Sequence, residues 1–290
     1  MLLFGSCTLI ILYLIGVIDD LVGVSYLTKF IVQILCSMML IAGGIWISDL
    51  HGFLGFHTLP AGVGYFLTIK FVVFILNAIN LIDGIDGLAC GLNSIALLIY
   101  GIAFTHLDQW LFAILAFATL GVLCSFFYYN VFGKVERKRK IFMGDTGSLT
   151  VGAIICILSI KFFHDPIASN LYCNPAVLAL SPLIIPSFDV LRVFIHRIRT
   201  KKHPFMPDKN HIHHKFLTIG MPQHTTMIAI IFISILFSIS NIFLSRYISI
   251  NLLLLGDIIL WVCGNIWLTG KIKQQNLFPA VAYNNNHLEK

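Results

Sequence analysis

Long apolar runs alternate with short polar segments along the whole chain. Nine such runs are present, near 1–18, 27–47, 62–80, 90–106, 109–129, 148–163, 174–196, 224–244 and 249–269. A helix needs about 20 mostly apolar residues to cross the hydrocarbon core of a bilayer. The pattern therefore predicts an all-α polytopic integral membrane protein with about nine transmembrane helices.

The composition supports a membrane protein with one domain. Hydrophobic residues make up 58% of the 290 residues and charged residues 11%, whereas soluble domains carry about 25% charged residues. No polar stretch is long enough to fold separately, so we expect a single transmembrane domain over 1–273 and a polar, disordered tail over 274–290. The seven cysteines form no CxxC pair, which indicates small apolar residues and not a disulfide framework.

Basic residues mark one side of the predicted bundle. The loops after the fifth and seventh runs contain Lys134, Arg137, Lys138, Arg139, Lys140, Arg197, Arg199, Lys201, Lys202, Lys209 and Lys215. The opposite loops contain only Lys161 and Arg246. The positive-inside rule therefore predicts that the basic side is cytoplasmic. These loops account for the net charge of +6, which gives no reason to expect nucleic acid.

Four polar motifs lie at the edges of apolar runs. They are GVIDD (16–20), NAINLIDGIDG (77–87), FMGDTGS (142–148) and HPFMPDKNHIHHK (203–215). Ionisable groups beside hydrocarbon are costly, so they are functional candidates by default. Counting runs puts all four motifs on the cytoplasmic side, which predicts an active site at that face. A transporter is the alternative class, but its ionisable groups would lie near the midplane.

The first two motifs offer carboxylates and amides. Asp19 and Asp20 end a helix, where their charges oppose the helix dipole, so we expect a metal, Lys29 or a bound proton beside them. A solvated helix end also fits this pair. The second motif places polar groups three residues apart, on one helical face: Asn77, Asn80, Asp83 and Asp86. A polar helix end with a glycine cap is the alternative.

The last two motifs suggest phosphate chemistry. Asp145 precedes an apolar run, where it either caps the helix or holds a divalent cation beside a helix N-terminus suited to phosphate. The histidine motif contains three imidazoles, His211, His213 and His214, between two lysines. Three imidazoles could bind zinc, but no cysteine lies near them and the neighbouring lysines suit an anion better, so we expect a diphosphate site. A basic loop attracted to anionic lipid is the alternative.

In this order, from Gly16 to about Lys215, the motifs resemble those of the polyprenyl-phosphate N-acetylhexosamine-1-phosphate transferases, of glycosyltransferase 4 type. Members transfer a sugar 1-phosphate from a UDP-N-acetylhexosamine to undecaprenyl phosphate at the bacterial cytoplasmic membrane, release UMP and use Mg²⁺. The PDKNHIHHK form is similar to the WecA/TagO-like branch, which uses UDP-GlcNAc to start cell-surface polysaccharides. The related phospho-MurNAc-pentapeptide translocase (MraY) has a histidine motif with a different amino-acid sequence, so it is the weaker match.

The resemblance implies a role for each matching residue. Asp145 and Asn80 would ligate Mg²⁺, with Mn²⁺ as an alternative, and Asp19 or Asp20 would deprotonate or hold the attacking lipid phosphate. The substrate-binding residues would be Lys29, Asn77, Asp83, Asp86, Asn130, His211, His213 and His214. Direct attack by the lipid phosphate is favoured over a two-step route through an aspartyl phosphate, because a phosphate oxyanion is already nucleophilic once it is oriented.

Family members usually have one or two further helices before the GVIDD span, so we expect this chain to be shortened at its N-terminus. The translocase of peptidoglycan synthesis and a truncated inactive homologue are the alternatives to the leading function. The residues do not distinguish between N-acetylhexosamines, which differ by hydroxyl groups read through a few polar contacts. Homodimer formation stays open.

Overall fold

The computed structural model describes residues 1–290 except 166, 169–170, 172, 202–210 and 286–290, and it gives no side-chain detail for 135 and 275–285. Its helices are α1 (Leu2–Val22), α2 (Tyr26–Ala42), α3 (Ala61–Ile82), α4 (Leu88–His106), α5 (Trp110–Phe132), α6 (Gly144–His164), α7 (Pro175–Leu180), α8 (Ile184–Arg199), α9 (Ile212–Thr218), α10 (Gln223–Leu244) and α11 (Ile250–Asn285). Short 3₁₀ turns are η1 (Phe53–Gly55), η2 (Val135–Arg137) and η4 (Ser181–Leu183). The described residues contain no strand, only an isolated bridge between Asp49 and Thr58.

The prediction of an all-α polytopic membrane protein is confirmed. Eight helical stretches in the described residues are long and apolar enough to cross a membrane. The one remaining predicted span, 27–47, is the shorter helix α2, whose 17 residues lie at the lower limit for spanning. The predicted span 174–196 consists of α7, η4 and α8 in series. The predicted polar tail, 274–290, is helical as far as Asn285.

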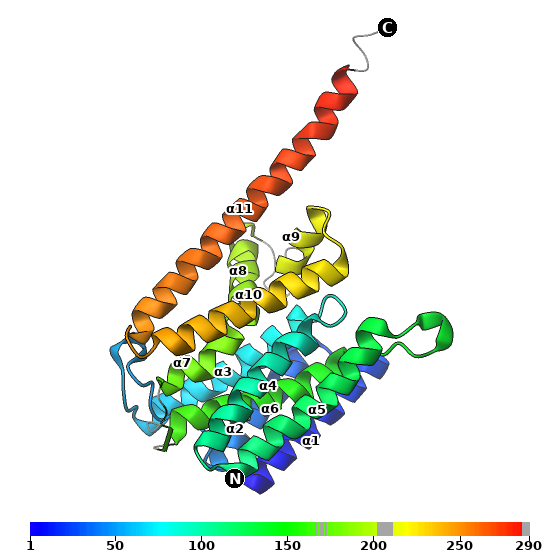
Figure 1. The fold of residues 1–290 in the computed structure, drawn as a ribbon. Helices are drawn as coiled ribbons and strands as arrows, with labels where there is room; N and C mark the ends of the chain where they lie inside the picture. Colours follow the sequence, from blue (N-terminus) through cyan, green and yellow to red (C-terminus); the bar gives the residue numbers. More distant parts are fainter. Residues whose placement is uncertain (166, 169–170, 172, 202–210, 286–290) are drawn as a thin grey trace.

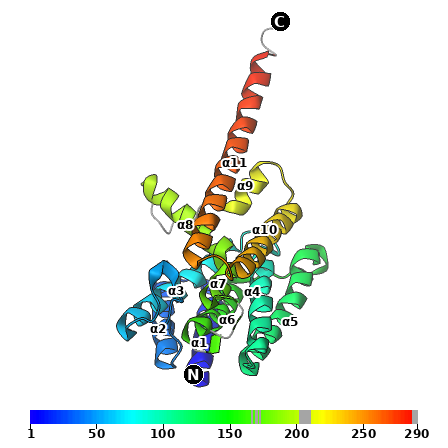
Figure 2. The ribbon, with the colours of Figure 1, turned by 60° about the vertical axis from the view of Figure 1, so that its left-hand side comes forward.

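Helix α6 lies at the centre of the bundle. It packs against α1, α3, α4, α5 and α7, and 78% of its spanning window is buried, compared with 22% for α1 and for α5. Figures 1 and 2 show α1, α3, α4, α5 and α6 running side by side, with the N-terminus and the C-terminus at opposite ends. Burial on all sides explains why α6 is apolar around its whole circumference.

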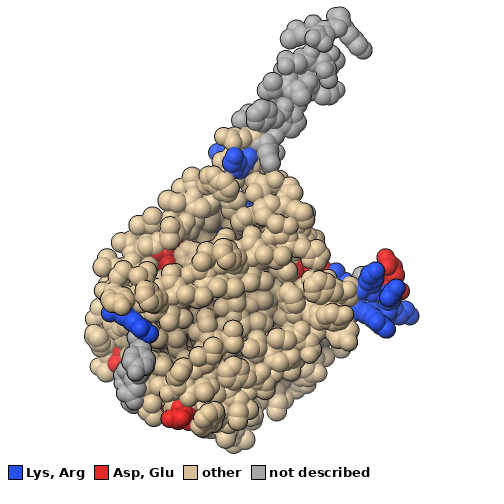
Figure 3. All heavy atoms as spheres, in the orientation of Figure 1, with Lys and Arg blue, Asp and Glu red and all other residues tan. Residues whose placement is uncertain are grey.

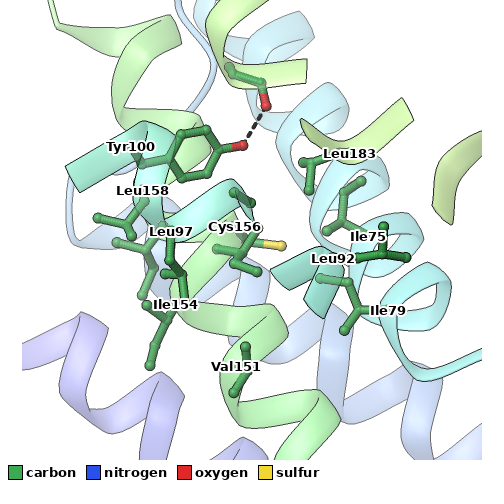
Figure 4. Packing of buried hydrophobic residues seen from close by; sticks show 14 of the residues in the cluster. Ile75, Ile79, Leu92, Leu97, Tyr100, Val151, Ile154, Cys156, Leu158 and Leu183 are labelled. Atoms are coloured by element: carbon green, nitrogen blue, oxygen red, sulfur yellow. Dashed lines mark hydrogen bonds between the residues drawn. The ribbon is translucent and has the colours of Figure 1, made fainter. Parts of the chain in front are cut away.

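Aromatic and aliphatic side chains fill the core between α3, α4 and α6 (Figure 4). Phe104 stacks on Phe162 with ring centroids 4.4 Å apart. The Tyr100 hydroxyl donates to the Ala179 carbonyl at 2.5 Å, which satisfies the polar atom of a fully buried ring. These contacts pack the C-terminal part of α4 against α6 and α7. The opposite end of α6, its N-terminus, carries the FMGDTGS motif.

Candidate active site

The end of α1 holds the beginning of α6. The Asp20 carboxylate accepts hydrogen bonds from the Asp145 amide at 2.8 Å, the Thr146 amide at 3.0 Å and the Thr146 hydroxyl at 2.6 Å. A carboxylate at a helix N-terminus is favourable because it satisfies free N–H groups and complements the dipole. Asp20 therefore acts as the N-terminal cap of a helix 125 residues away in sequence.

Two glycines permit this close approach of α1 and α6. A Cβ atom on Gly16 would lie 2.5 Å from the Thr146 Cα, so the two helix backbones nearly touch there. Gly144 has a φ of +59°, and a Cβ atom on it would lie 2.6 Å from a carboxylate oxygen of Asp20. The glycines of the first and third motifs are thus required by packing and by backbone conformation.

Lys29 of α2 joins the first and third motifs through charge. Its ammonium lies 2.5 Å from the Asp19 carboxylate and also forms an ion pair with Asp145. The second oxygen of Asp19 accepts from the Val24 amide at 2.6 Å. Asp19 and Asp145 therefore face one cation from two helices, which is the positive partner expected from the sequence for the Asp19–Asp20 pair.

Asn80 of α3 brings the second motif to the same carboxylate. Its side-chain amide donates to Asp145 at 2.9 Å and to the Ser148 hydroxyl at 2.9 Å. Asn77, one turn earlier, donates to the side chain of Gln33 at 2.7 Å. The face of α3 predicted from the three-residue spacing therefore points toward α2 and α6.

The 83–87 segment turns away from α3 beside this cluster. Asp83 makes no side-chain hydrogen bond with any described residue. Although its side chain is exposed, the surrounding protein removes part of its water, and the carboxylates of Asp86 and Asp145 repel its charge; together these raise the pKa of Asp83 to about 6. Asp86 forms an ion pair with Lys140 at 2.5 Å.

Asn130 organises the loops around the cluster. Its side-chain oxygen accepts from the Gly87 amide at 2.6 Å, and its side-chain nitrogen donates to the Ile141 carbonyl at 2.8 Å. It thereby connects the start of α4 to the segment before α6. Its amide is used for these backbone contacts, and the substrate-binding role implied by the resemblance stays a prediction.

The histidine motif is anchored on α8. Asp189, which is fully buried, accepts from His211 at 2.8 Å, from the Ile212 amide at 2.9 Å and from Arg192 at 2.8 Å. A buried carboxylate is tolerated because it is paired and hydrogen-bonded on both oxygens. Asp189 and Arg192 thus hold the start of α9.

His213 connects this motif to the second one. A Cβ atom on Gly84 would lie 2.2 Å from the His213 Nε2, so the ring packs directly on the glycine. The ring is 1% exposed, and neither nitrogen has a hydrogen-bond partner among the described residues. Burial, with help from the neighbouring His214, lowers the pKa of His213 to about 4. His213 is therefore a neutral imidazole with donor and acceptor capacity to spare.

All four motifs are consequently joined by contacts. Asp20 links the first to the third, Asn80 links the second to the third, and Gly84 links the second to the fourth. Sequence reasoning missed Gln33 and assigned no role to Asp189. A glutamine within an apolar run is costly unless it is paired, and that signal is enough to find Gln33.

The donor set suits a hard divalent cation. Among the described residues, no three acidic, histidine or cysteine side chains lie together as ligands. Mg²⁺ commonly uses one or two carboxylates and completes its shell with water and substrate phosphates. Asp145 and the side-chain oxygen of Asn80, which accepts no hydrogen bond from a described residue, fit that smaller set. The ammonium of Lys29 beside Asp145 shows that this position accommodates positive charge.

Comparison with known proteins identifies the family of this chain. Residues 2–163 match the model of the family described as glycosyl transferase family 4. The match covers more than half of the chain and includes three of the four motifs. The chain therefore belongs to glycosyl transferase family 4, and its long apolar helices make it a multi-pass membrane protein.

Several similar proteins are named as transferases that act on a polyprenyl phosphate. The chain is 32% identical over 262 residues to the probable undecaprenyl-phosphate N-acetylglucosaminyl 1-phosphate transferase of Bacillus subtilis (strain 168), a match covering 88% of this chain and 71% of the relative. It is 33% identical to the decaprenyl-phosphate N-acetylglucosaminephosphotransferase of Mycobacterium leprae (strain TN), covering 76% and 58%. It is 27% identical to the undecaprenyl-phosphate alpha-N-acetylglucosaminyl 1-phosphate transferase of Yersinia pestis, covering 90% and 72%. The chain thus spans about three fifths to three quarters of their lengths.

Proposed function

We propose that this protein transfers N-acetylglucosamine 1-phosphate from UDP-N-acetylglucosamine to undecaprenyl phosphate and releases UMP, with Mg²⁺ as cofactor. The observation that carries the proposal is the set of contacts that joins the four motifs around Asp145. Oxygen ligands, a lysine and imidazoles at one end of a membrane bundle suit phosphoryl transfer to a lipid. The names of the relatives support the sugar and the acceptor.

Asp145 is the centre of the proposed reaction. Mg²⁺, held by Asp145 and Asn80, would neutralise the charge of the diphosphate. Lys29 then orients a phosphate oxygen and stays within reach of Asp19. The oxygens of Asp20 accept three hydrogen bonds from the start of α6, so Asp19 is the better candidate for deprotonating the acceptor phosphate.

His213 supports the diphosphate through hydrogen bonding. Its ring is neutral at physiological pH because burial lowers its pKa to about 4. A neutral imidazole donates from one nitrogen and accepts at the other, and both nitrogens lack a described partner. His211 is oriented by Asp189, which fixes the direction in which α9 presents these rings.

An apolar groove beside the site suits the acceptor chain. A cavity of about 380 Å³ lies between α2, α3 and α8. Its walls include Phe30, Ile34 and Val73, and its lining also includes Asn77 and His211, which belong to the motifs described above. An isoprenoid chain has the chemistry of the walls, and its phosphate would lie beside the polar residues. The proposal places this end of the bundle at the cytoplasmic face of the bacterial inner membrane, in line with the positive-inside rule.

Product analysis tests the proposal. Purified protein in detergent is given undecaprenyl phosphate, Mg²⁺ and either UDP-N-acetylglucosamine or UDP-MurNAc-pentapeptide, and the lipid extract is analysed by mass spectrometry. We expect a lipid-linked N-acetylglucosamine diphosphate from the first donor alone. Product from the second donor would instead identify the peptidoglycan translocase. UMP release without any acceptor would contradict direct attack and indicate a two-step route.

A further inference from the structure

A second, larger groove lies between α8 and α11, and none of the residues given a role in the proposed reaction lines it. Its volume is about 830 Å³. Figure 2 shows α8 and α11 diverging toward their C-terminal ends. The groove and the apolar cavity proposed for the acceptor share one residue, Leu191 of α8, so the two cavities lie on different sides of that helix.

The walls of this groove differ sharply in chemistry. The α8 wall carries Arg192, His196 and Arg199 at helical spacing, which places them on one face. The α11 wall carries Ile258, Val262 and Ile266, also at helical spacing, with exposed fractions of 41%, 46% and 67%. Arg192 and Arg199 thus face an aliphatic stripe across an open space.

Basic residues gather at one end of the groove. Lys215 of α9 lines it and hydrogen-bonds to Asn265 and Thr269 of α11 at 3.1 Å each. Lys273 of α11 adds another ammonium group. Among the described lining residues none is acidic. Burial and the positive charge of Arg192 lower the pKa of Lys215 to about 8, and the Asp189 carboxylate offsets only part of this shift.

The dimensions fit one leaflet of a bilayer. Ile258 and Lys273 are 15 residues apart in α11, which is about 22 Å along the helix axis. Half of a bilayer with its headgroup region is also about 20–22 Å thick. A molecule that fills the groove therefore has an anionic head at the Lys273 end and an apolar body along Ile258 and Val262.

We propose that the α8–α11 groove is a binding site for an anionic phospholipid of the surrounding membrane. The headgroup binds Arg199, Lys215 and Lys273, and an acyl chain covers the aliphatic stripe of α11. This lipid is not a reactant and differs from the acceptor in the α2–α3–α8 cavity. Lys215 belongs to α9 and hydrogen-bonds to α11 at this end of the groove, so a headgroup bound there also steadies the helix that carries His213.

Fluorescence quenching by brominated lipid tests the site directly. Trp261 lines the groove, and the difference between the wild-type protein and Trp261→Phe isolates its signal. The protein is placed in phosphatidylcholine nanodiscs with a small fraction of phosphatidylglycerol or phosphatidylcholine whose acyl chains are brominated. We expect several-fold stronger quenching of Trp261 by the phosphatidylglycerol than by the phosphatidylcholine.

Two matched charge variants identify the residues responsible. Arg199→Gln/Lys273→Gln removes two positive charges from the groove, and Lys138→Gln/Arg139→Gln removes two from the loop between α5 and α6. Figure 3 shows basic side chains gathered on that loop, away from α11. The first variant should weaken phosphatidylglycerol binding about thirtyfold, since each basic residue near an anionic headgroup contributes about 1 kcal/mol. The second variant should bind like the wild type.

Three results would overturn the proposal. The first is equal quenching by the two brominated lipids. The second is equal loss of binding in both charge variants, which would indicate general attraction to the membrane surface. The third is displacement of the brominated lipid by undecaprenyl phosphate and not by unlabelled phosphatidylglycerol, which would assign the groove to the acceptor. Thermal melting of each variant in detergent checks that it is folded, and none of these measurements depends on transferase activity.

Discussion

Substitution of Gly84 by alanine tests the contact that joins the histidine motif to the rest of the site. The new Cβ atom would lie 2.2 Å from the His213 Nε2 and 2.4 Å from its Cε1. Ordinary contact begins near 3.5 Å, so the ring must move by about 1.3 Å. Misplacement of a catalytic constellation by about 1 Å can cost a hundredfold in rate. We therefore expect kcat/KM of Gly84→Ala to fall about a hundredfold, or about 2.7 kcal/mol.

The assay is the initial rate of UMP release at several donor concentrations. Gly121→Ala in α5 is the matched control, because a Cβ atom there meets nothing within 4 Å, and it should retain wild-type kcat/KM. A double-mutant cycle then isolates the cause. Gly84→Ala/His213→Ala should be no slower than His213→Ala alone, because the clash is gone. Wild-type kcat/KM in Gly84→Ala, or additive losses in the double variant, would refute the reasoning.

Three further predictions follow from the same contacts. Asp20→Ala removes the cap of α6 and should cost about 1–2 kcal/mol of stability, seen as a lower melting temperature in detergent; equal melting of Asp20→Ala and the loop variant Glu136→Ala would contradict this. Lys29→Met should lower kcat/KM about a hundredfold and Lys29→Arg less so, and equal activity of the two would argue against a role for charge. The pKa of His213 is about 4 in the folded protein, below its ordinary value of 6.5. Between these two pH values the unfolded chain binds a proton that the folded chain does not. The free energy of unfolding should therefore decrease as the pH falls from 6.5 to 4. His213→Gln should flatten this melting profile, and an unchanged profile would show that another group is responsible.

Local apolar runs predict most of the helices but not the breaks within them. The run 62–80 corresponds to Ala61–Ile82, and 224–244 to Gln223–Leu244, because a spanning helix depends mainly on its own hydrophobicity. The run 174–196 looks continuous, yet Ser181–Leu183 forms a 3₁₀ turn within it. Pro182 lies in this turn and lacks an amide hydrogen for regular helical bonding. Hydropathy does not report such a break.

The candidate site is partly predictable for a similar reason. The motif residues and their common end of the bundle follow from run counting, but their partners depend on tertiary packing. The Asp20 cap of α6 and the Asn130 contacts with Gly87 and Ile141 join segments far apart in sequence. Nothing local distinguishes a capping carboxylate from a metal ligand, since both are oxygen donors at a helix end.

The most direct test of the central claim compares two aspartates on opposite ends of α6. UMP release from UDP-N-acetylglucosamine is measured with undecaprenyl phosphate and a Mg²⁺ titration, for the wild type, Asp145→Asn and Asp165→Asn. We expect lipid- and Mg²⁺-dependent release by the wild type and by Asp165→Asn, and none above background by folded Asp145→Asn. Full activity of Asp145→Asn, with an unchanged Mg²⁺ requirement, would show that Asp145 is not the centre of the reaction.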